Sequence, residues 1–342
     1  MKGRFGKALV VSVLAFFFAS IVGCTMGTRP PKKIKPRLER GEEAVVGFVL
    51  PRRTEDFTAM EGPILDMAER SPYDIKVEFG YGDGTCQSQA SIIERMIGIE
   101  KLKVLAVYPA TDDFKPLVKA MKKAKKKGIA VLAMEILPPG FKPMSTILSD
   151  DMGGGWMVAD YIVNSFPKNT PLKIVVLDLK EPKKRKLSPL EKLMISRIKD
   201  RSKGLEDGFY PYPEKKVLER PKVENDRAAV KSFLLEKLRT DYKDVDFIMA
   251  PTDEMALGAL DAVREAGAKA KVTGYGNSQE AISEISKGGP LILTVKDQPV
   301  EIGKKAMDRA LAYFNGEDLG RRYDVDIAIV DIKSLPAQTA AR

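Results

Sequence analysis

The 342-residue sequence contains no histidine, two cysteines and a single tryptophan. Without histidine, the chain has neither the Ser-His-Asp and Cys-His arrangements of nucleophilic catalysis nor the commonest zinc ligand. General acid–base catalysis near neutral pH would then require a strongly shifted pKa of a Glu, Lys or Cys. The glycine runs match neither a Walker motif nor a dinucleotide-binding fingerprint. We therefore expect no catalytic residues, no metal site and no cofactor.

The scarce residues themselves give few functional signals. Cys86 has no cationic side chain shortly before it that would lower its thiol pKa, so we expect a partly buried, unreactive side chain. Trp156 lies in a segment with helical spacing and is expected to serve in packing. The second cysteine, Cys24, belongs to a different kind of motif, described below.

Positive charge exceeds negative charge by a formal +10. The excess is concentrated in residues 1–7, 25–42, 119–127 and 183–186, and Phe5 is the single aromatic residue within these runs. Nucleic-acid binding sites usually combine basic and aromatic side chains on one face. The charge placement instead favours solvated faces or attraction to anionic lipid, and we expect no nucleic-acid partner.

The N-terminus has the pattern of an export signal. A basic start is followed by the apolar run 8–22, which is short for a membrane span and suits a signal-peptide core. It ends in Ile-Val-Gly-Cys, which resembles the lipobox of bacterial lipoproteins, where the chain is cut before the cysteine and that cysteine is lipidated. We expect a signal peptide at 1–23, lipidation of Cys24 and a Pro/Lys-rich linker within 24–42. The alternative is an uncleaved membrane anchor, and both place the folded part outside the cytoplasm, in the periplasm or on the outer face of the cell membrane.

From residue 44 onward, apolar runs of strand length alternate with helix-like segments. The predicted strands are 44–50, 75–79, 104–108, 129–134, 174–179, 217–218, 246–250, 271–275 and 291–295, and the predicted helices are 59–70, 87–99, 114–127, 155–166, 193–210, 227–238 and 254–266. This alternation predicts an α/β fold of parallel sheets with helices on both faces. The predicted strands and helices are too many to pack around a single hydrophobic core. We therefore expect two doubly wound lobes.

The stretch PTDEMALGAL at 251–260 contains two adjacent acids directly after a predicted strand. Paired carboxylates can form an acid–base pair or a metal site, but no histidine or third partner accompanies them. A helix start explains them better, with Thr252 or Asp253 capping the first amides and Glu254 favouring the helix dipole. Asp150 and Asp151 before GGGWMVADYI could bind a hard cation, but a helix N-cap explains them better.

Several motifs occur together in one order: LSDDMGGGWMVADYI, DRSKGLEDGF, TDEMALGAL, VTGYGNSQEAI and VKDQPVEIGKKAM. This set resembles the type I periplasmic sugar-binding proteins, the group that contains the ribose-binding protein. The resemblance implies two lobes joined by three crossovers, hinge closure on one solute, delivery to an ABC transporter permease, and a monomer. It places one lobe at 43–149 plus 299–325 and the other at 150–298 plus 326–342.

The resemblance also implies a ligand site between the lobes. The residues at the family's contact positions are Phe57, Glu135, Arg201, Asn225, Thr252, Asp253, Gly276, Asn277 and Asp297. The family's Asp-Arg pair has become Glu135-Ile136, and its paired aromatics are reduced to Phe57, so ribose itself is not the expected ligand. We expect another sugar, a polyol or a solute with an amine. Arg201 has a second interpretation, as a surface arginine of a helix.

Two other functions share this fold. A lipoprotein that binds a solute and feeds a sensor kinase or chemoreceptor would have the same sequence features, so that alternative stays open. A repressor-type regulator would begin with a DNA-binding helix-turn-helix. This chain has an apolar export segment at that position, which argues against the regulator.

Overall fold

The computed structural model describes residues 37–167, 169–182 and 186–335. The predicted signal peptide, Cys24 and most of the predicted linker lie outside the described residues and stay predictions. Among the described residues, no helix combines the length and apolar character needed to cross a membrane.

The first lobe is built on a six-stranded parallel sheet. Its strands, in spatial order, are β13 (Arg322–Val325), β5 (Ser145–Ser149), β4 (Ala130–Met134), β3 (Leu102–Val107), β1 (Glu43–Leu50) and β2 (Asp74–Tyr81). The helices α2 (Glu55–Thr58), α3 (Glu61–Glu69) and α11 (Pro299–Phe314) cover one face, and α4 (Cys86–Met96) and α5 (Phe114–Lys126) cover the other. The central strands β1 and β4 are apolar and buried from Ala44 to Leu50 and from Ala130 to Met134, because both faces are covered.

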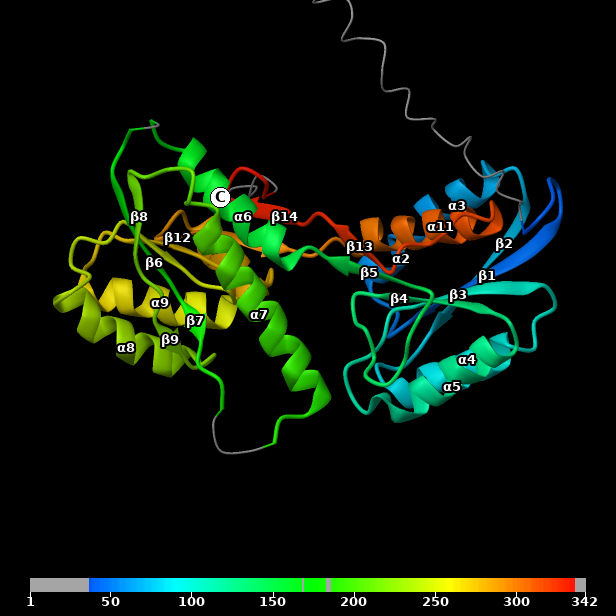
Figure 1. Cartoon of the computed structure of the whole chain (residues 1–342). Coiled ribbons are helices and arrows are strands. Elements are labelled where there is room, and N and C mark those ends of the chain that lie inside the picture. Colours follow the sequence, from blue (N-terminus) through cyan, green and yellow to red (C-terminus); the bar gives the residue numbers. More distant parts are fainter. Residues whose placement is uncertain (1–36, 168, 183–185, 336–342) are drawn as a thin grey trace, which may run out of the picture.

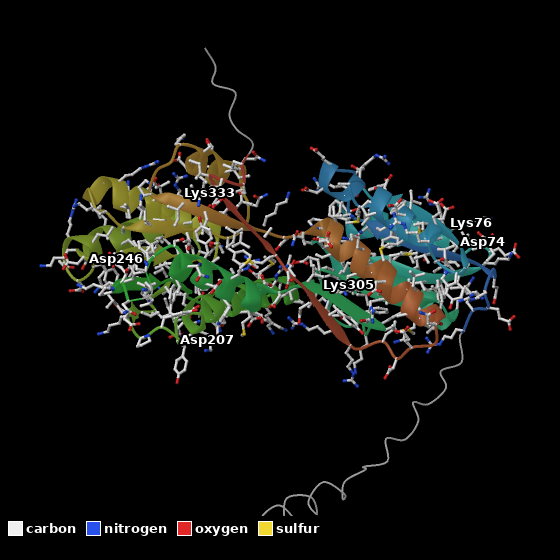
Figure 2. All side chains as sticks on the ribbon, turned by 90° about the horizontal axis from the view of Figure 1, so that it is seen from above. Asp74, Lys76, Asp207, Asp246, Lys305 and Lys333 are labelled. Atoms are coloured by element: carbon white, nitrogen blue, oxygen red, sulfur yellow. The ribbon has the colours of Figure 1, made fainter. Side chains whose placement is uncertain are left out.

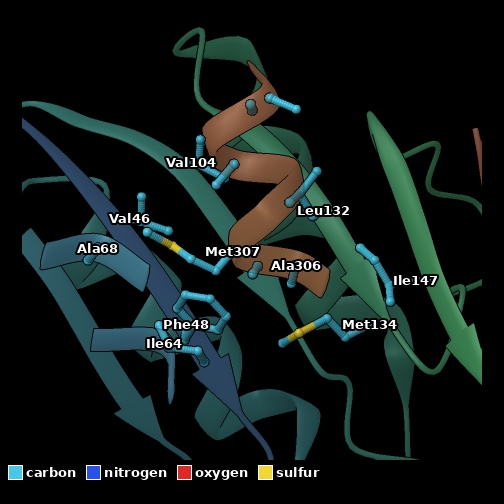
Figure 3. Close-up of a cluster of buried hydrophobic side chains, with 14 of the residues drawn as sticks. Val46, Phe48, Ile64, Ala68, Val104, Leu132, Met134, Ile147, Ala306 and Met307 are labelled. Atoms are coloured by element: carbon cyan, nitrogen blue, oxygen red, sulfur yellow. The ribbon is translucent and has the colours of Figure 1, made fainter. Parts of the chain in front are cut away.

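Helix α11 returns from the second lobe to complete the core of the first. Its Ala306 and Met307 are fully buried in the same cluster as Val46 and Phe48 of β1 (Figure 3). Segments about 250 residues apart in sequence therefore share one core. The first lobe cannot form from the N-terminal half alone without exposing this apolar face.

The second lobe has a six-stranded sheet of the same kind. Its strands, in spatial order, are β14 (Ala328–Asp331), β12 (Leu291–Lys296), β11 (Lys271–Thr273), β10 (Phe247–Met249), β6 (Leu172–Val176) and β8 (Lys215–Glu219), with a separate pair β7 (Asp178–Leu179) and β9 (Lys222–Val223). Only β14 is antiparallel to its neighbour in this described sheet. The helices α6 (Asp151–Asn164) and α7 (Pro189–Asp207) lie on one face, and α8 (Arg227–Arg239), α9 (Asp253–Ala266) and α10 (Gln279–Ser286) lie on the other.

The chain passes between the two sheets three times. It crosses from β5 to α6, from β12 to α11, and from β13 to β14 (Figure 1). The predicted fold class, two doubly wound parallel-sheet lobes joined by three crossovers, is confirmed.

The carboxyl ends of both sheets face the junction between the lobes. Asp74 begins β2 and Asp246 directly precedes β10, and these two residues lie near the outer ends of the two lobes (Figure 2). The parallel strands therefore run from the outer ends toward the junction. Loops that follow strands in such sheets form the ligand site, so both lobes present theirs to the same region.

Several local predictions differ from the structure, and α7 begins at Pro189, four residues before the predicted 193. Helix α6 begins at Asp151, four residues before the predicted 155–166, because Asp150 caps it by accepting a hydrogen bond from the Gly153 amide at 2.8 Å. Trp156 is 44% exposed rather than packed. Cys86 is fully buried rather than partly so, and burial raises the pKa of its thiol to about 12.

Candidate functional site

Helix α7 supplies two arginines that lie one turn apart on the same face, with Arg201 buried and Arg197 partly buried. Arg197 and Arg201 have side chains only 13% and 9% exposed. The helix is held close to α6 because Gly204 lacks a side chain: a Cβ there would lie 2.0 Å from the Met152 carbonyl oxygen. This close approach brings both guanidinium groups to the first turn of α6.

Asp151 binds both arginines. Its Oδ1 accepts a hydrogen bond from Arg201 Nε at 2.7 Å, and its Oδ2 accepts one from Arg197 Nε at 2.6 Å. Arg201 also stacks over the Tyr275 ring, with its guanidinium carbon 3.8 Å from the ring centre. Arg201 is therefore an interior residue rather than the surface arginine of the alternative interpretation.

The Arg197 guanidinium group also contacts the first lobe across the junction. Its Nη2 lies 2.5 Å from Glu135 Oε1, directly after β4, and 3.9 Å from Asp297 Oδ1 in the crossover between β12 and α11. One guanidinium group thus joins the second lobe, the first lobe and a connection between them. Arg197 was not predicted as a site residue, although its position four residues before Arg201 places it on the same helix face.

Glu135 adopts a left-handed backbone conformation with φ of 60°, which is uncommon for a residue with a side chain. Its Oε2 accepts hydrogen bonds from the Ser149 amide at 3.0 Å and the Ser149 hydroxyl at 2.9 Å. Burial raises the pKa of Glu135, and Asp297 adds to this effect, while Arg197 opposes it. The carboxyl group is therefore fixed by the end of β5, close to the first crossover.

Three buried polar atoms in this region lack a hydrogen-bond partner among the described residues. They are Glu135 Oε1, Asp297 Oδ1 and the Tyr275 hydroxyl. Glu135 Oε1 contacts Arg197 closely as an ion pair, but not in the alignment of a hydrogen bond. Burial raises the pKa of Tyr275, so its hydroxyl stays protonated near neutral pH. Buried polar groups without hydrogen bonds are costly, so these three atoms are the candidate contacts of this site.

An aromatic pair lies near the same acids. Phe57 meets Tyr108 edge to face, with ring centres 4.9 Å apart. Burial raises the pKa of Tyr108, and the negative charges of Glu135 and Asp297 raise it further. The structure therefore brings Phe57, Glu135 and Asp297 into one region, and adds Tyr108, which was not predicted from sequence.

The remaining predicted residues lie on the second lobe. Thr252 caps α9 by accepting a hydrogen bond from the Met255 amide at 3.2 Å, and its hydroxyl donates to Asn225 Oδ1 at 2.6 Å. The Thr252–Asn225 pair lies close to Arg201, because the carbonyl oxygen of the neighbouring Pro251 is 3.4 Å from Arg201 Nη1.

Asp253 has a different environment from its neighbour. It is buried, and its two oxygens accept hydrogen bonds from the Thr294 hydroxyl and the Ser278 amide, both at 2.6 Å. Next to it, Gly276 and Asn277 have positive φ values of 145° and 58°. Asp253 therefore holds this loop through hydrogen bonds to Ser278 and Thr294.

Within the described residues, no group of three or more Cys, Asp or Glu side chains could hold a metal ion. The acids near Arg197 are instead arranged around the two arginines.

Comparison with known proteins gives this geometry a context. Residues 46–318 match the family model described as periplasmic binding protein domain. The ribose import binding protein of Haemophilus influenzae is 26% identical over 259 residues, covering 74% of this chain and 82% of that protein.

Two solved structures show the same fold. An ABC transporter periplasmic solute-binding protein from Actinobacillus succinogenes, with bound D-allose, has a TM-score of 0.53 at 20% identity and covers 85% of this chain and 98% of that one. AraP, an arabinose-binding protein from Geobacillus stearothermophilus, has a TM-score of 0.61 at 18% identity. The match covers 86% of this chain and 97% of AraP. Because the family model matches most of the chain, the protein belongs to the type I periplasmic sugar-binding proteins, a family of solute-binding proteins.

Proposed function

We propose that the protein is an extracytoplasmic solute-binding lipoprotein that closes its two lobes on a polar, sugar-like molecule and delivers it to an ABC transporter permease. The observation that supports this most directly is the set of unpaired buried atoms around Arg197, contributed by Glu135, Asp297 and Tyr275 at the lobe junction. Glu135 follows a strand of the first sheet and Tyr275 follows a strand of the second. A solute bound to both would therefore hold the lobes together.

The charges of the cluster restrict the ligand class. The acids Glu135, Asp151 and Asp297 outnumber the arginines Arg197 and Arg201. Both arginines already pair with carboxylates, so an anionic ligand would find no free countercharge in this cluster. Two of the unpaired atoms are carboxylate oxygens, which accept hydrogen bonds. We therefore favour a neutral sugar or polyol, or a solute with an amine, all of which donate several hydrogen bonds.

A thermal-shift screen tests this function. The panel contains ribose, D-allose and arabinose, which the relatives' names suggest, together with polyols and amino compounds. A true ligand at 100 times its Kd should stabilise the protein by about 2.7 kcal/mol. Failure of all three classes to raise Tm would contradict the proposal.

Replacing Tyr275 by phenylalanine should weaken the ligand found in that screen about tenfold without lowering Tm. The tyrosine hydroxyl is buried and has no partner in the described part of the chain, so removing it spares a desolvation cost and removes one ligand contact. Titration calorimetry and thermal unfolding measure the two effects.

Tyr242→Phe is the matched control. The Tyr242 hydroxyl donates a hydrogen bond to Glu219, far from the cluster, so this change should lower Tm and leave affinity unchanged. If Tyr275→Phe and Tyr242→Phe lose ligand affinity equally, or if Tyr275→Phe keeps its affinity, Tyr275 does not contact the ligand.

The export part of the proposal has its own test. Cell fractionation should recover the protein with the membrane as a lipidated species, and a cytosolic, unlipidated protein would contradict it. A sensor kinase or chemoreceptor partner stays the alternative to the permease, and neighbouring genes for a permease and an ATPase would favour transport.

A further inference from the structure

A groove lies along the β13 edge of the first lobe, where the folded part of the chain begins. Its volume is about 750 Å³, and two loops form most of it: residues 135–144 between β4 and β5, and residues 315–321 between α11 and β13. Arg37, the first described residue, also lines it. We call this the edge groove.

Positive charge exceeds negative charge in the lining of the edge groove. The cationic lining residues are Arg37, Lys142, Arg321 and Arg322, and the acidic ones are Glu317 and Asp318. Arg322 pairs with Asp324 at 2.7 Å. The side chains of Lys142 and Arg321 are exposed and have no ion-pair or hydrogen-bond partner in the part of the chain that the structure describes. The charge of these two residues is therefore available to an anionic partner.

Exposed apolar side chains accompany these charges in the groove. Leu137 is 41% exposed and Met144 is 39% exposed. The loops that carry them are held on the lobe, because Phe141 and Leu319 are buried in its core. Apolar contact and attraction of basic side chains act together when a protein lies at the surface of an anionic bilayer. The edge groove offers both.

The chain before Arg37 would bring a bilayer close to this groove. The Arg37 amide donates a hydrogen bond to the Phe314 carbonyl oxygen, which fixes the start of the folded chain at the end of α11. Twelve residues separate Arg37 from Cys24, and they carry four basic and no acidic side chains. An extended chain spans at most about 3.3–3.6 Å per residue, so a lipidated Cys24 would lie within about 45 Å of Arg37. The edge groove is thus the part of the folded chain next to the predicted tether.

We propose that the edge groove is a membrane-contact surface that binds an anionic lipid bilayer, an inference that rests on the lipid anchoring in the proposed function. The anchor would keep the groove at a high local concentration near the lipid, so a weak attraction is sufficient. The unpaired charges of Lys142 and Arg321 attract the lipid headgroups, and Leu137 and Met144 enter the interface. Contact through this edge would orient the first lobe on the bilayer, which a tether alone does not do.

The experiment measures co-sedimentation with phosphatidylglycerol vesicles and, separately, with phosphatidylcholine vesicles. The protein is the chain from residue 24 onward with Cys24→Ser, which carries no lipid and keeps every described residue. The groove variant carries Lys142→Glu and Arg321→Glu. The control variant carries Lys216→Glu and Lys243→Glu, two exposed lysines of the second lobe, and has the same change in net charge.

We expect the wild type to bind phosphatidylglycerol vesicles, to lose this binding steeply as salt increases, and to bind phosphatidylcholine vesicles far more weakly. The groove variant should bind about tenfold more weakly or worse, and the control should lose less than about threefold, because only the groove charges lie against the lipid. Both variants should keep the wild-type Tm, since the replaced side chains are exposed. Leu137→Ser with Met144→Ser should weaken binding about threefold without changing its salt dependence, because this variant loses apolar contact and no charge.

Three results would overturn the proposal: no binding of the wild type to phosphatidylglycerol vesicles, equal losses in the groove and control variants, or unchanged binding of the groove variant. Equal losses would show attraction by overall net charge, and unchanged binding would show that the basic linker alone contacts the lipid. Cell fractionation separates this inference from the proposed function. A lipidated, membrane-associated protein whose lipid-free form does not bind vesicles contradicts only the edge groove, whereas a cytosolic, unlipidated protein contradicts the proposed function whatever the vesicle result.

Discussion

Replacing Arg197 by alanine is expected to destabilise the protein by about 3–5 kcal/mol, because it leaves the buried Glu135 carboxylate of the first lobe without its countercharge. Glu135 is 4% exposed and loses the only cation within ion-pair distance of it in the described structure. The same change removes the direct link between α7 and the first lobe's β4 end. Urea unfolding gives the loss of stability, and small-angle scattering should show an increased radius of gyration as the lobes separate.

Arg227→Ala provides the comparison. Arg227 also pairs with two carboxylates, Asp261 and Glu280, but it is 37% exposed and all three residues belong to the second lobe. The Arg227→Ala change should lower the free energy of unfolding by about 1 kcal/mol or less and leave the radius of gyration unchanged. If both variants behaved alike, the link between the lobes would not depend on Arg197.

A double variant separates charge from shape. Arg197→Met together with Glu135→Gln should be more stable than Arg197→Met alone, because the glutamine carries no charge to leave unpaired. The coupling free energy is expected to be about 0.5–3 kcal/mol. If the stability changes of the two single variants simply add up in the double variant, the Arg197–Glu135 ion pair contributes nothing to the free energy of unfolding.

The second large effect is expected for Gly204→Ala. The added Cβ would lie 2.0 Å from the Met152 carbonyl oxygen, so α6 and α7 must move apart. We expect a loss of about 3 kcal/mol in the free energy of unfolding, together with weaker solute binding, since the shift displaces Arg197 and Arg201 from Asp151. Denaturant unfolding and titration calorimetry measure the two effects.

Gly62→Ala is the control for helix propensity. Gly62 lies within α3, and a Cβ there would meet no atom within 4 Å. Alanine at this position should stabilise the protein by about 0.4–1 kcal/mol. A similar gain for Gly204→Ala would mean that the α6–α7 contact is more tolerant than its geometry indicates.

The sequence by itself determined the layered architecture. Long apolar strands such as 44–50 and 129–134 can only be buried on both faces, and the helices between them are amphipathic, so a parallel α/β fold follows from local pattern alone. Both helix starts were also predicted as N-caps, because capping depends on neighbouring residues, but only the structure identifies Asp150 and Thr252 as the capping residues. Helix α11 and the strands β13 and β14 were identified only through the family resemblance or not at all, since their apolar residues pack against partners far away in sequence.

The tertiary structure alone decided which polar residues share a site. Arg201 and Asp253 were both predicted to face a ligand, and the structure adds contacts the sequence did not show, with Asp151 for Arg201 and with the Ser278 amide for Asp253. Arg197 became central only because the close packing of α6 and α7 directs it across the junction to Glu135. Local sequence fixes backbone conformation over a few residues, whereas the pairing of charges depends on distances between elements that only the packed lobes define.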